Sequence, residues 1–394
     1  MRCKNIQKGY SLHMKNRIPL SVPNFKGNEL HYVTQAVEQE WVSSGGTYVS
    51  AFEKNMATYA KEKAAVALQS GTAALHLALM ECGVQRGDLV IAPALTFIAA
   101  INPIRYIGAD PIFMDCDDSL CMDMQKLSSY LDTDCERRGD KLYDKQLNRP
   151  VTAIVVVHVF GNGADMQALM ILAHKYNLPV IEDATEALGS FYTKGVYAGK
   201  MCGCIGNFGS YSFNGNKIIT TGGGGMLVGQ DRQKLDHIRY LSTQAKDDEW
   251  YFVHNEVGYN YRMTNLQAAL GVAQLEQLNA FIDTKKRNYE LYQKEGLSLL
   301  AFSNDIRPNY WFYSYLTDHR DRLLQHLRAQ GIQARPVWTL NHIQKPYVGC
   351  KQYKIDKAPY YWERIINLPC SSNLDSESVK RVAATVLAFE KGQV

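Results

Sequence analysis

The sequence predicts an α/β protein with a mostly parallel sheet in a large domain and a smaller α+β domain at the carboxyl end. Short apolar segments and longer segments of helical periodicity alternate over residues 64–182, as they do where helices connect parallel strands. Residues 152–157 (TAIVVV) are continuously apolar, which is typical of a strand covered on both faces. Later in the chain a single long helical segment replaces the alternation. We therefore expect a large domain over residues 1–255, including an amino-terminal arm at 1–26, and a small domain over residues 256–394.

Two amphipathic helices are expected before the first strand. Residues 27–41 place apolar side chains at helical spacing. Residues 50–59 continue this spacing and begin with Ser50 and Glu53, a pair that can form a capping box. The first strand is expected over residues 64–68 (AAVAL), where a short apolar run ends at polar residues.

A small-residue turn follows this strand and leads into a helix. Residues 69–72 (QSGT) are small or polar, and the helix after them runs to Gly83. Such a turn offers free backbone N–H groups and the positive end of the helix dipole to an anion. Residues 134–149 are charged and lack periodicity, so they are expected to form an exposed excursion. Further strands are expected at residues 88–92, 111–115, 178–181 and 209–213, and further helices at 96–107, 122–131, 165–176, 264–289 and 321–330.

The composition excludes several classes of protein. The chain has 394 residues and a formal net charge of +4, with no dense basic block, which does not suit nucleic-acid binding. Its nine cysteines are scattered, so no disulfide framework is expected. Cys202 and Cys204 lack further ligands at zinc-binding spacing. No apolar run reaches the ~18 residues of a membrane span, and the polar start is not a secretory signal. We expect a cytoplasmic protein without a metal site.

One lysine stands in an unusual setting. Lys217 lies between an aromatic-rich strand at residues 209–213 and four consecutive glycines at residues 222–225. Such glycines cost backbone entropy and are useful where the main chain must turn tightly or pass close to another group. A half-buried lysine has a lowered pKa and can act as the amine nucleophile of Schiff-base chemistry. The plain alternative is a loop lysine beside a glycine hinge, and the segment by itself does not separate the two.

Other candidate residues lie where predicted strands end, which is the edge at which open α/β sheets bind ligands. Asp183 could pair with a ring nitrogen of a bound cofactor, or it could simply cap the next helix. Residues 70–72 (SGT) could cradle a phosphate, and Ser212 could add a hydroxyl to the same anion. Phe97 could stack on an aromatic ring, although a single phenylalanine is more often part of a core.

A phosphate cradle, a stacking ring, a carboxylate and a lysine are together the contacts that pyridoxal phosphate needs. The carboxylate would keep the pyridine nitrogen protonated, and the lysine would form the Schiff base and move protons. His158 and Glu186 also follow strand ends, and Arg335 lies towards the domain junction, so each is a candidate for holding a substrate. Competing motifs fail, because no Ser or Thr follows Lys217 as in a P-loop and no GxGxxG follows the first strand.

Five ordered motifs carry a resemblance to a known family. They are SGTAALHLAL (70–79), PALTFIAA (93–100), EDATEALG (182–189), YSFNGNK (211–217) and GYNYRMTNLQAALG (258–271). In this order they resemble the DegT/DnrJ/EryC1/StrS sugar aminotransferases, from about residue 18 to the carboxyl end. The segments IPLSVPN, WVSSGG, HNEVGYNYRMTNLQAA and GIQARPVW look like the branch acting on UDP-linked 4-keto-6-deoxy-N-acetylhexosamines, which includes the legionaminic-acid pathway enzyme.

The resemblance implies a pyridoxal-phosphate-dependent aminotransferase of fold type I, and a homodimer whose active sites are shared between subunits. Glu186 stands at a cofactor-facing position where many members carry His or Gln. The positions that match the family's cofactor contacts are Lys217 (Schiff base), Asp183 (pyridine nitrogen), Phe97 (ring stacking), Gly71, Thr72 and Ser212 (phosphate) and, from the other subunit, Asn260 (phosphate).

The expected reaction is amino transfer from L-glutamate to C4 of a nucleotide-linked, first of all UDP-linked, 4-keto-6-deoxy-N-acetylhexosamine. Its product would be a 4-amino-4,6-dideoxy sugar for surface-glycan biosynthesis. Relatives that replace the lysine by His dehydrate sugars instead, so Lys217 favours transamination. The alternatives are a GDP- or dTDP-linked substrate, a regulator that binds pyridoxal phosphate without catalysis, and a purely structural sheet protein.

Overall fold

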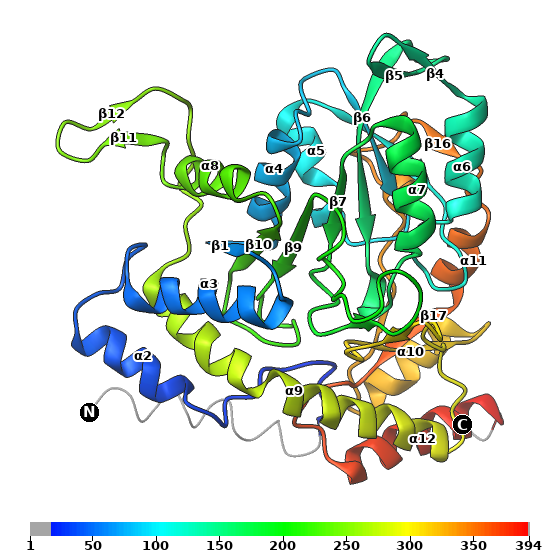
Figure 1. Cartoon of the computed structure of the whole chain (residues 1–394). Helices are drawn as coiled ribbons and strands as arrows, with labels where there is room; N and C mark the ends of the chain where they lie inside the picture. The colour runs from blue at the N-terminus through cyan, green and yellow to red at the C-terminus, as the bar shows by residue number, and fades with distance from the viewer. Residues whose placement is uncertain (1–16, 393–394) are drawn as a thin grey trace.

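The computed structural model describes residues 17–392 and is built around a ten-stranded sheet (Figure 1). The main strands lie in the order β1-β10-β9-β7-β6-β2-β3-β16. All of these except β10 point the same way, because β10 is antiparallel to both of its neighbours. The prediction of a mostly parallel sheet is therefore confirmed. The strand bounds are β1 (Ala64–Leu68), β10 (Gly225–Gly229), β9 (Phe208–Ser212), β7 (Val180–Asp183), β6 (Arg149–Val157), β2 (Leu89–Pro93), β3 (Asp110–Met114) and β16 (Gln352–Tyr353).

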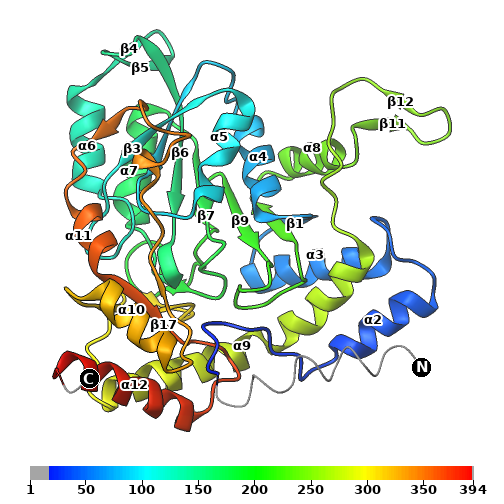
Figure 2. The same cartoon turned by 180° about the vertical axis from the view of Figure 1, so that it is seen from behind.

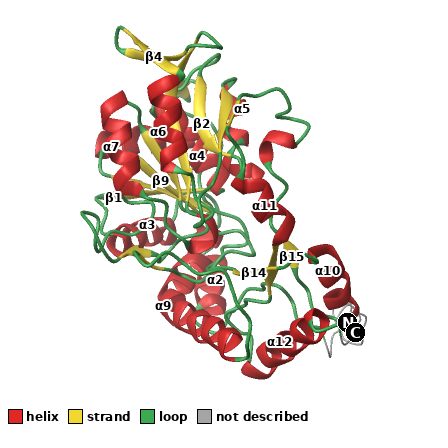
Figure 3. Ribbon diagram, turned by 90° about the vertical axis from the view of Figure 1, so that its right-hand side faces the viewer, coloured by secondary structure: helices red, strands yellow, loops and turns green. Residues whose placement is uncertain are grey.

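Helices cover both faces of this sheet (Figure 3). On one face α4 (Gly71–Glu81) packs against β7, β9 and β10 and against α5 (Asn102–Ile107) and α8 (Arg232–Ser242). On the other face α6 (Met124–Thr133) packs against α7 (Met166–Tyr176). The apolar residues of β6 are buried between these layers, which is why that strand carries no polar alternation. The predicted cap of α7 is confirmed, because Asp165 Oδ1 accepts a hydrogen bond from Ala168 N (3.0 Å).

A long helix, α9 (Asn265–Lys294), leads from the sheet into the carboxyl-terminal part of the chain. It begins with a capping box formed by Thr264 and Gln267 and packs first against α2 (Glu29–Glu38) and α3 (Thr47–Ala60). Its far end packs against α12 (Ser376–Glu390), and beyond it lies a three-stranded sheet in the order β14-β17-β15. Helix α9 therefore packs against elements from both the amino-terminal and the carboxyl-terminal parts of the chain. We propose that the domain boundary lies near residue 256. The other elements here are α10 (Arg320–Ala329), α11 (Lys357–Arg364), β14 (Tyr313–Leu316), β15 (Arg335–Pro336) and β17 (Ile365–Leu368).

The start of α3 differs from the prediction. The helix begins at Thr47, with Gly46 as its N-cap residue, so Ser50 lies inside it and the expected capping box at Ser50 is wrong. The cap comes instead from another element, because Asn265 Oδ1 accepts a hydrogen bond from Tyr48 N (3.0 Å). A side chain at position 46 would collide with Asn265, since a Cβ built there lies 2.2 Å from its Oδ1. Because Asn265 lies far from Gly46 in the sequence, the residues around Gly46 give no indication of this cap.

Residues 134–149 also differ from the prediction, because they form a hairpin and not an irregular excursion. Strands β4 (Cys135–Arg138) and β5 (Lys141–Asp144) pair with each other, and β5 pairs with β6. Asp144 is fully buried and accepts hydrogen bonds from Tyr130 Oη (2.7 Å) and Lys351 Nζ (2.5 Å). The predicted exposure of the segment holds for most of its residues, and Asp144 is a buried charge within it.

Two smaller features complete the fold. The predicted helix at residues 96–107 is divided into a 3-10 turn (Ile98–Ala100) and α5, whose first turn contains Pro103, a position that needs no N–H donor. The hairpin β11 (Lys246–Asp248) and β12 (Val253–His254) stands out from the body of the protein (Figure 2). None of the helices within residues 17–392 is long and apolar enough to cross a membrane.

Candidate active site

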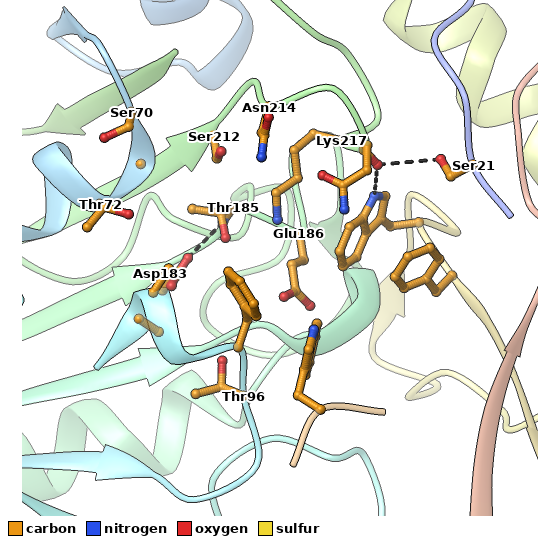
Figure 4. Close-up of a pocket in the computed structure, with 18 of the residues that line it drawn as sticks. Ser21, Ser70, Thr72, Thr96, Asp183, Thr185, Glu186, Ser212, Asn214 and Lys217 are labelled. Carbon is orange, nitrogen blue, oxygen red and sulfur yellow. Dashed lines mark hydrogen bonds between the residues drawn. The ribbon is translucent and has the colours of Figure 1, made fainter. Parts of the chain in front are cut away.

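A cavity of about 560 Å³ opens where β1, β7 and β9 end (Figure 4). Its walls come from the turn before α4, the segments that follow β7 and β9, and residues of β15 from the carboxyl-terminal part. Most of the residues expected to act in the site meet here. Those that line the cavity are Gly71, Thr72, Phe97, Asp183, Glu186, Ser212, Lys217 and Arg335.

The start of α4 forms a pocket for an anion. Ser70 caps the helix, because its Oγ accepts a hydrogen bond from Ala73 N (3.0 Å). The N–H groups of Gly71 and Thr72 have no hydrogen-bond partner within residues 17–392. A Cβ at position 71 would lie 3.0 Å from both Ser212 Cβ and Thr185 Cγ2. Gly71 thus lets the helix start approach Ser212 closely, and this arrangement of N–H groups and a hydroxyl fits a phosphate.

Asp183 is the last residue of β7 and its side chain is buried at the cavity wall. Its Oδ1 accepts a hydrogen bond from Thr185 N (3.1 Å), and the side chain of Thr185 also forms a hydrogen bond with this carboxylate. Burial raises the pKa of Asp183, while its bonds with Thr185 and the nearby charge of Lys217 oppose that shift. A buried carboxylate at the wall of a cavity is suited to a protonated ring nitrogen.

Lys217 lies in the loop after β9, and Figure 4 shows its side chain reaching towards Glu186. Burial lowers the pKa of Lys217, and the carboxylates of Glu186 and Asp183 oppose this change without cancelling it. A lowered pKa leaves more of the amine neutral near pH 7, as a nucleophile or proton acceptor requires. The predicted half-buried setting of this lysine is the one observed.

Glu186 is 3% exposed, and one of its carboxylate oxygens, Oε2, accepts a hydrogen bond from Phe160 N (2.8 Å). Burial raises the pKa of Glu186 to about 7, although the charge of Lys217 counteracts the rise. This carboxyl group therefore changes its charge near neutral pH inside the cavity.

The outer part of the cavity is aromatic and basic. Phe97 is half exposed, and its ring centroid lies 6.2 Å from that of Trp338. Arg335 on β15 is exposed and carries its positive charge at the cavity wall. Because Phe97 is exposed and borders the cavity, its ring is better suited to stacking on a bound ring than to filling a core.

His158 and Asn260 do not line the cavity. The side chain of His158 is fully buried, with Nε2 2.8 Å from Glu182 Oε2 and with Nδ1 accepting a hydrogen bond from Ala164 N (3.2 Å). The expected contact of His158 with substrate does not fit this position, since both ring nitrogens are already used. Asn260 is exposed and pairs with Thr243, so its reach into another subunit's site stays a prediction.

The sequence did not single out several residues that line the cavity. Thr185 follows Asp183 by two positions and could have been found from that place alone. Gln333 and Trp338 lie in the segment GIQARPVW, which carries part of the resemblance, but they were not assigned to the cavity. Further lining residues come from segments without a strand-end or periodic signal and are brought in by packing of the carboxyl-terminal part; among them are Trp311, Phe312 and Asn367.

Residues 23–387 match the sequence profile of the DegT/DnrJ/EryC1/StrS aminotransferase family. The chain belongs to this family. It is 37% identical over 378 residues to GDP-perosamine synthase from Escherichia coli O157:H7, with 94% of this chain and 98% of the relative covered. It is 35% identical over 386 residues to GDP-perosamine synthase from Caulobacter vibrioides, with 94% and 97% covered. Its fold matches the crystal structure of the aminotransferase TlmJ from Streptoalloteichus hindustanus with a TM-score of 0.85 at 24% identity, covering 96% of this chain and 100% of TlmJ.

Membership confirms the family expected from the sequence, and with it the cofactor. The protein is a nucleotide-sugar aminotransferase that depends on pyridoxal 5′-phosphate. The residues that line the cavity fit that group, because the anion pocket at Gly71, the buried carboxylate of Asp183 and the amine of Lys217 border the same volume. The legionaminic-acid branch is not singled out, since both relatives described above are GDP-perosamine synthases.

Proposed function

We propose that this enzyme transfers an amino group from L-glutamate to C4 of a nucleotide-linked 4-keto-6-deoxyhexose. The observation that carries the proposal is the convergence of Lys217, Asp183 and the start of α4 on one cavity. The product would be a 4-amino-4,6-dideoxy sugar of the kind used in surface glycans. The donor and the sugar would use the same site in turn, as expected for an enzyme that stores the amino group on its cofactor between them.

Different residues of the cavity would hold different parts of the cofactor. The N–H groups of Gly71 and Thr72 and the hydroxyl of Ser212 would bind its phosphate. When bound, pyridoxal phosphate supplies an electron-withdrawing ring that makes the neighbouring C–H bond of the amino donor acidic. Asp183 would pair with the protonated ring nitrogen, and Phe97 would lie against the ring.

Lys217 would carry the protons of the reaction. Because burial lowers the pKa of Lys217, its Nζ would be able to accept the proton from Cα of glutamate near neutral pH. In the second half of the cycle the same atom would deliver a proton to C4 of the sugar. Glu186 lies close enough to influence the charge of Lys217, and it would contact the cofactor or the sugar.

Two nucleotides are candidates for the substrate. A GDP-linked sugar is favoured by the identity of 35 to 37% with two GDP-perosamine synthases over more than nine tenths of the chain. A UDP-linked N-acetylated sugar is favoured by the segments IPLSVPN and WVSSGG. In either case the exposed Arg335 would pair with the diphosphate. We also propose a homodimer in which Asn260 of one subunit reaches the phosphate in the other.

A substrate panel tests this function. The purified protein with pyridoxal phosphate and L-glutamate is offered GDP-, UDP- and dTDP-linked 4-keto-6-deoxy sugars, and 2-oxoglutarate and amino sugar are quantified. We expect one nucleotide to give turnover and Lys217→Ala to give none. If glutamate changes the visible absorbance of the cofactor but no sugar is aminated, the proposed acceptor is wrong. If glutamate changes nothing, the protein is a binder of the cofactor without catalysis.

A further inference from the structure

The indole of Trp311 contacts the lysine segment in two ways. Nζ of Lys217 lies 4.3 Å from the centroid of the Trp311 ring. The Nε1–H group of the same indole donates a hydrogen bond to the carbonyl oxygen of Asn216 (2.9 Å). One contact acts on the amino group itself and the other on the backbone immediately before it.

Trp311 is held firmly by its neighbours. Trp311 is 2% exposed, its ring stacks on Phe312 with 4.1 Å between the ring centroids, and its backbone N–H donates to Asn309 Oδ1 (2.9 Å). Asn309 is fully buried, and its Nδ2 donates to the carbonyl oxygens of Glu186 (2.9 Å) and Leu188 (3.0 Å). The same residues therefore tie the indole to the segment that carries Glu186.

Apart from the charges of Glu186 and Asp183, which favour its protonated form, Lys217 has few contacts that could hold its amino group. No ion pair of Lys217 and no hydrogen bond of its Nζ occurs within residues 17–392, and the neighbouring Asn214 and Asn216 are exposed. The face of an indole carries negative charge density and attracts an ammonium group, more strongly when water is excluded. Trp311 is thus the contact that can retain a protonated Lys217 in this cavity.

We propose that Trp311 is a positioning residue that holds the side chain of Lys217 while its amine is protonated and not joined to the cofactor. The ring favours the protonated amine, and the bond to Asn216 keeps the loop in place. The inference rests on the proposed role of Lys217 as the working amine. A residue that merely filled space would not need its Nε1–H on this carbonyl or its ring face towards this amine.

The test measures the titration of Lys217 directly. Two samples of the full-length protein are used, one without added cofactor and one with pyridoxamine 5′-phosphate. Each is acetylated competitively across a range of pH, and the peptide that contains Lys217 is quantified by mass spectrometry. Trp311→Leu should lower the midpoint of Lys217 labelling by about half to one pH unit, since a cation–π contact is being removed. Trp311→Phe, which keeps a weaker ring, should shift it less. Trp338→Leu is the matched control, because this second indole of the cavity contacts Phe97 and Phe160.

An unchanged or raised midpoint in a folded Trp311→Leu protein would overturn the proposal, because the indole would then act only by excluding water. If Trp311→Leu does not fold, an unchanged or raised midpoint in Trp311→Phe would overturn the proposal in the same way. As a second readout, the pH profile of kcat should move with the labelling midpoint, and a change confined to KM for the sugar would also overturn it. Labelling needs no sugar, so a shifted midpoint in a protein that aminates no sugar would leave this inference standing while the proposed function fails.

Discussion

Replacing Glu186 by Gln should flatten part of the pH dependence of stability in the protein freed of its cofactor. Glu186 is buried, and its pKa is raised from 4.5 to about 7, mainly by that burial. A group whose pKa is raised by folding stabilises the folded state below its unfolded pKa. This contribution is lost as pH rises through the folded pKa, so the wild-type protein should lose stability between about pH 4.5 and 7.

The size of the effect follows from the two pKa values. The difference between about 7 and 4.5 is about 2.5 pH units. At 1.36 kcal/mol per unit this corresponds to about 3 kcal/mol in the free energy of unfolding, most of it between pH 5 and 8. Glutamine has nearly the same shape, and its Oε1 can still accept the hydrogen bond from Phe160 N. The variant should therefore lack the titration without a cavity or an unpaired N–H.

Urea unfolding of both proteins at pH 5, 6, 7 and 8 measures this difference. We expect the wild-type protein to lose about 2 to 3 kcal/mol more than Glu186→Gln across this range. Glu249→Gln is the control, because Glu249 is an exposed carboxylate on the β11–β12 hairpin. Parallel curves for wild type and Glu186→Gln would refute the assignment of a raised pKa to this residue.

Four further predictions concern the cofactor contacts. Lys217→Ala should abolish turnover while keeping the fold and binding of pyridoxamine phosphate; near-normal transamination would mean the nucleophile is misassigned. Asp183→Asn should retain the cofactor but slow turnover by orders of magnitude, and rates within about tenfold of wild type, or ~1.4 kcal/mol, would exclude it as the ring partner. Gly71→Ala should weaken cofactor binding about tenfold in a titration, because the added Cβ lies 3.0 Å from neighbouring side chains and must displace the start of α4. In subunit mixing, Lys217→Ala with Asn260→Ala should exceed the activity of both parents at limiting cofactor; activity that stays at their average, with exchange verified, would exclude the shared site.

The strand-end rule predicted several residues of the cavity wall and misplaced His158. Asp183 and Ser212 end their strands, the turn at Gly71 follows β1, and all of them line the cavity. His158 satisfies the same rule, because it follows β6 directly. Its side chain turns instead towards the buried carboxylate of Glu182. The rule gives the position of a residue, but the direction of its side chain depends on partners elsewhere in the chain.

The same dependence on distant partners governs the lysine segment. The carbonyl oxygen of Asn216 accepts a hydrogen bond from Trp311 Nε1 (2.9 Å) and a longer one from Ser21 Oγ (3.5 Å), so two segments far apart in the sequence meet beside Lys217. Sequence patterns mark the lysine and the glycines after it, because those residue types are unusual there. They do not mark the acceptor, which is a backbone atom that every residue has. The contacts that fix the lysine could therefore be found only once the chain was folded around it.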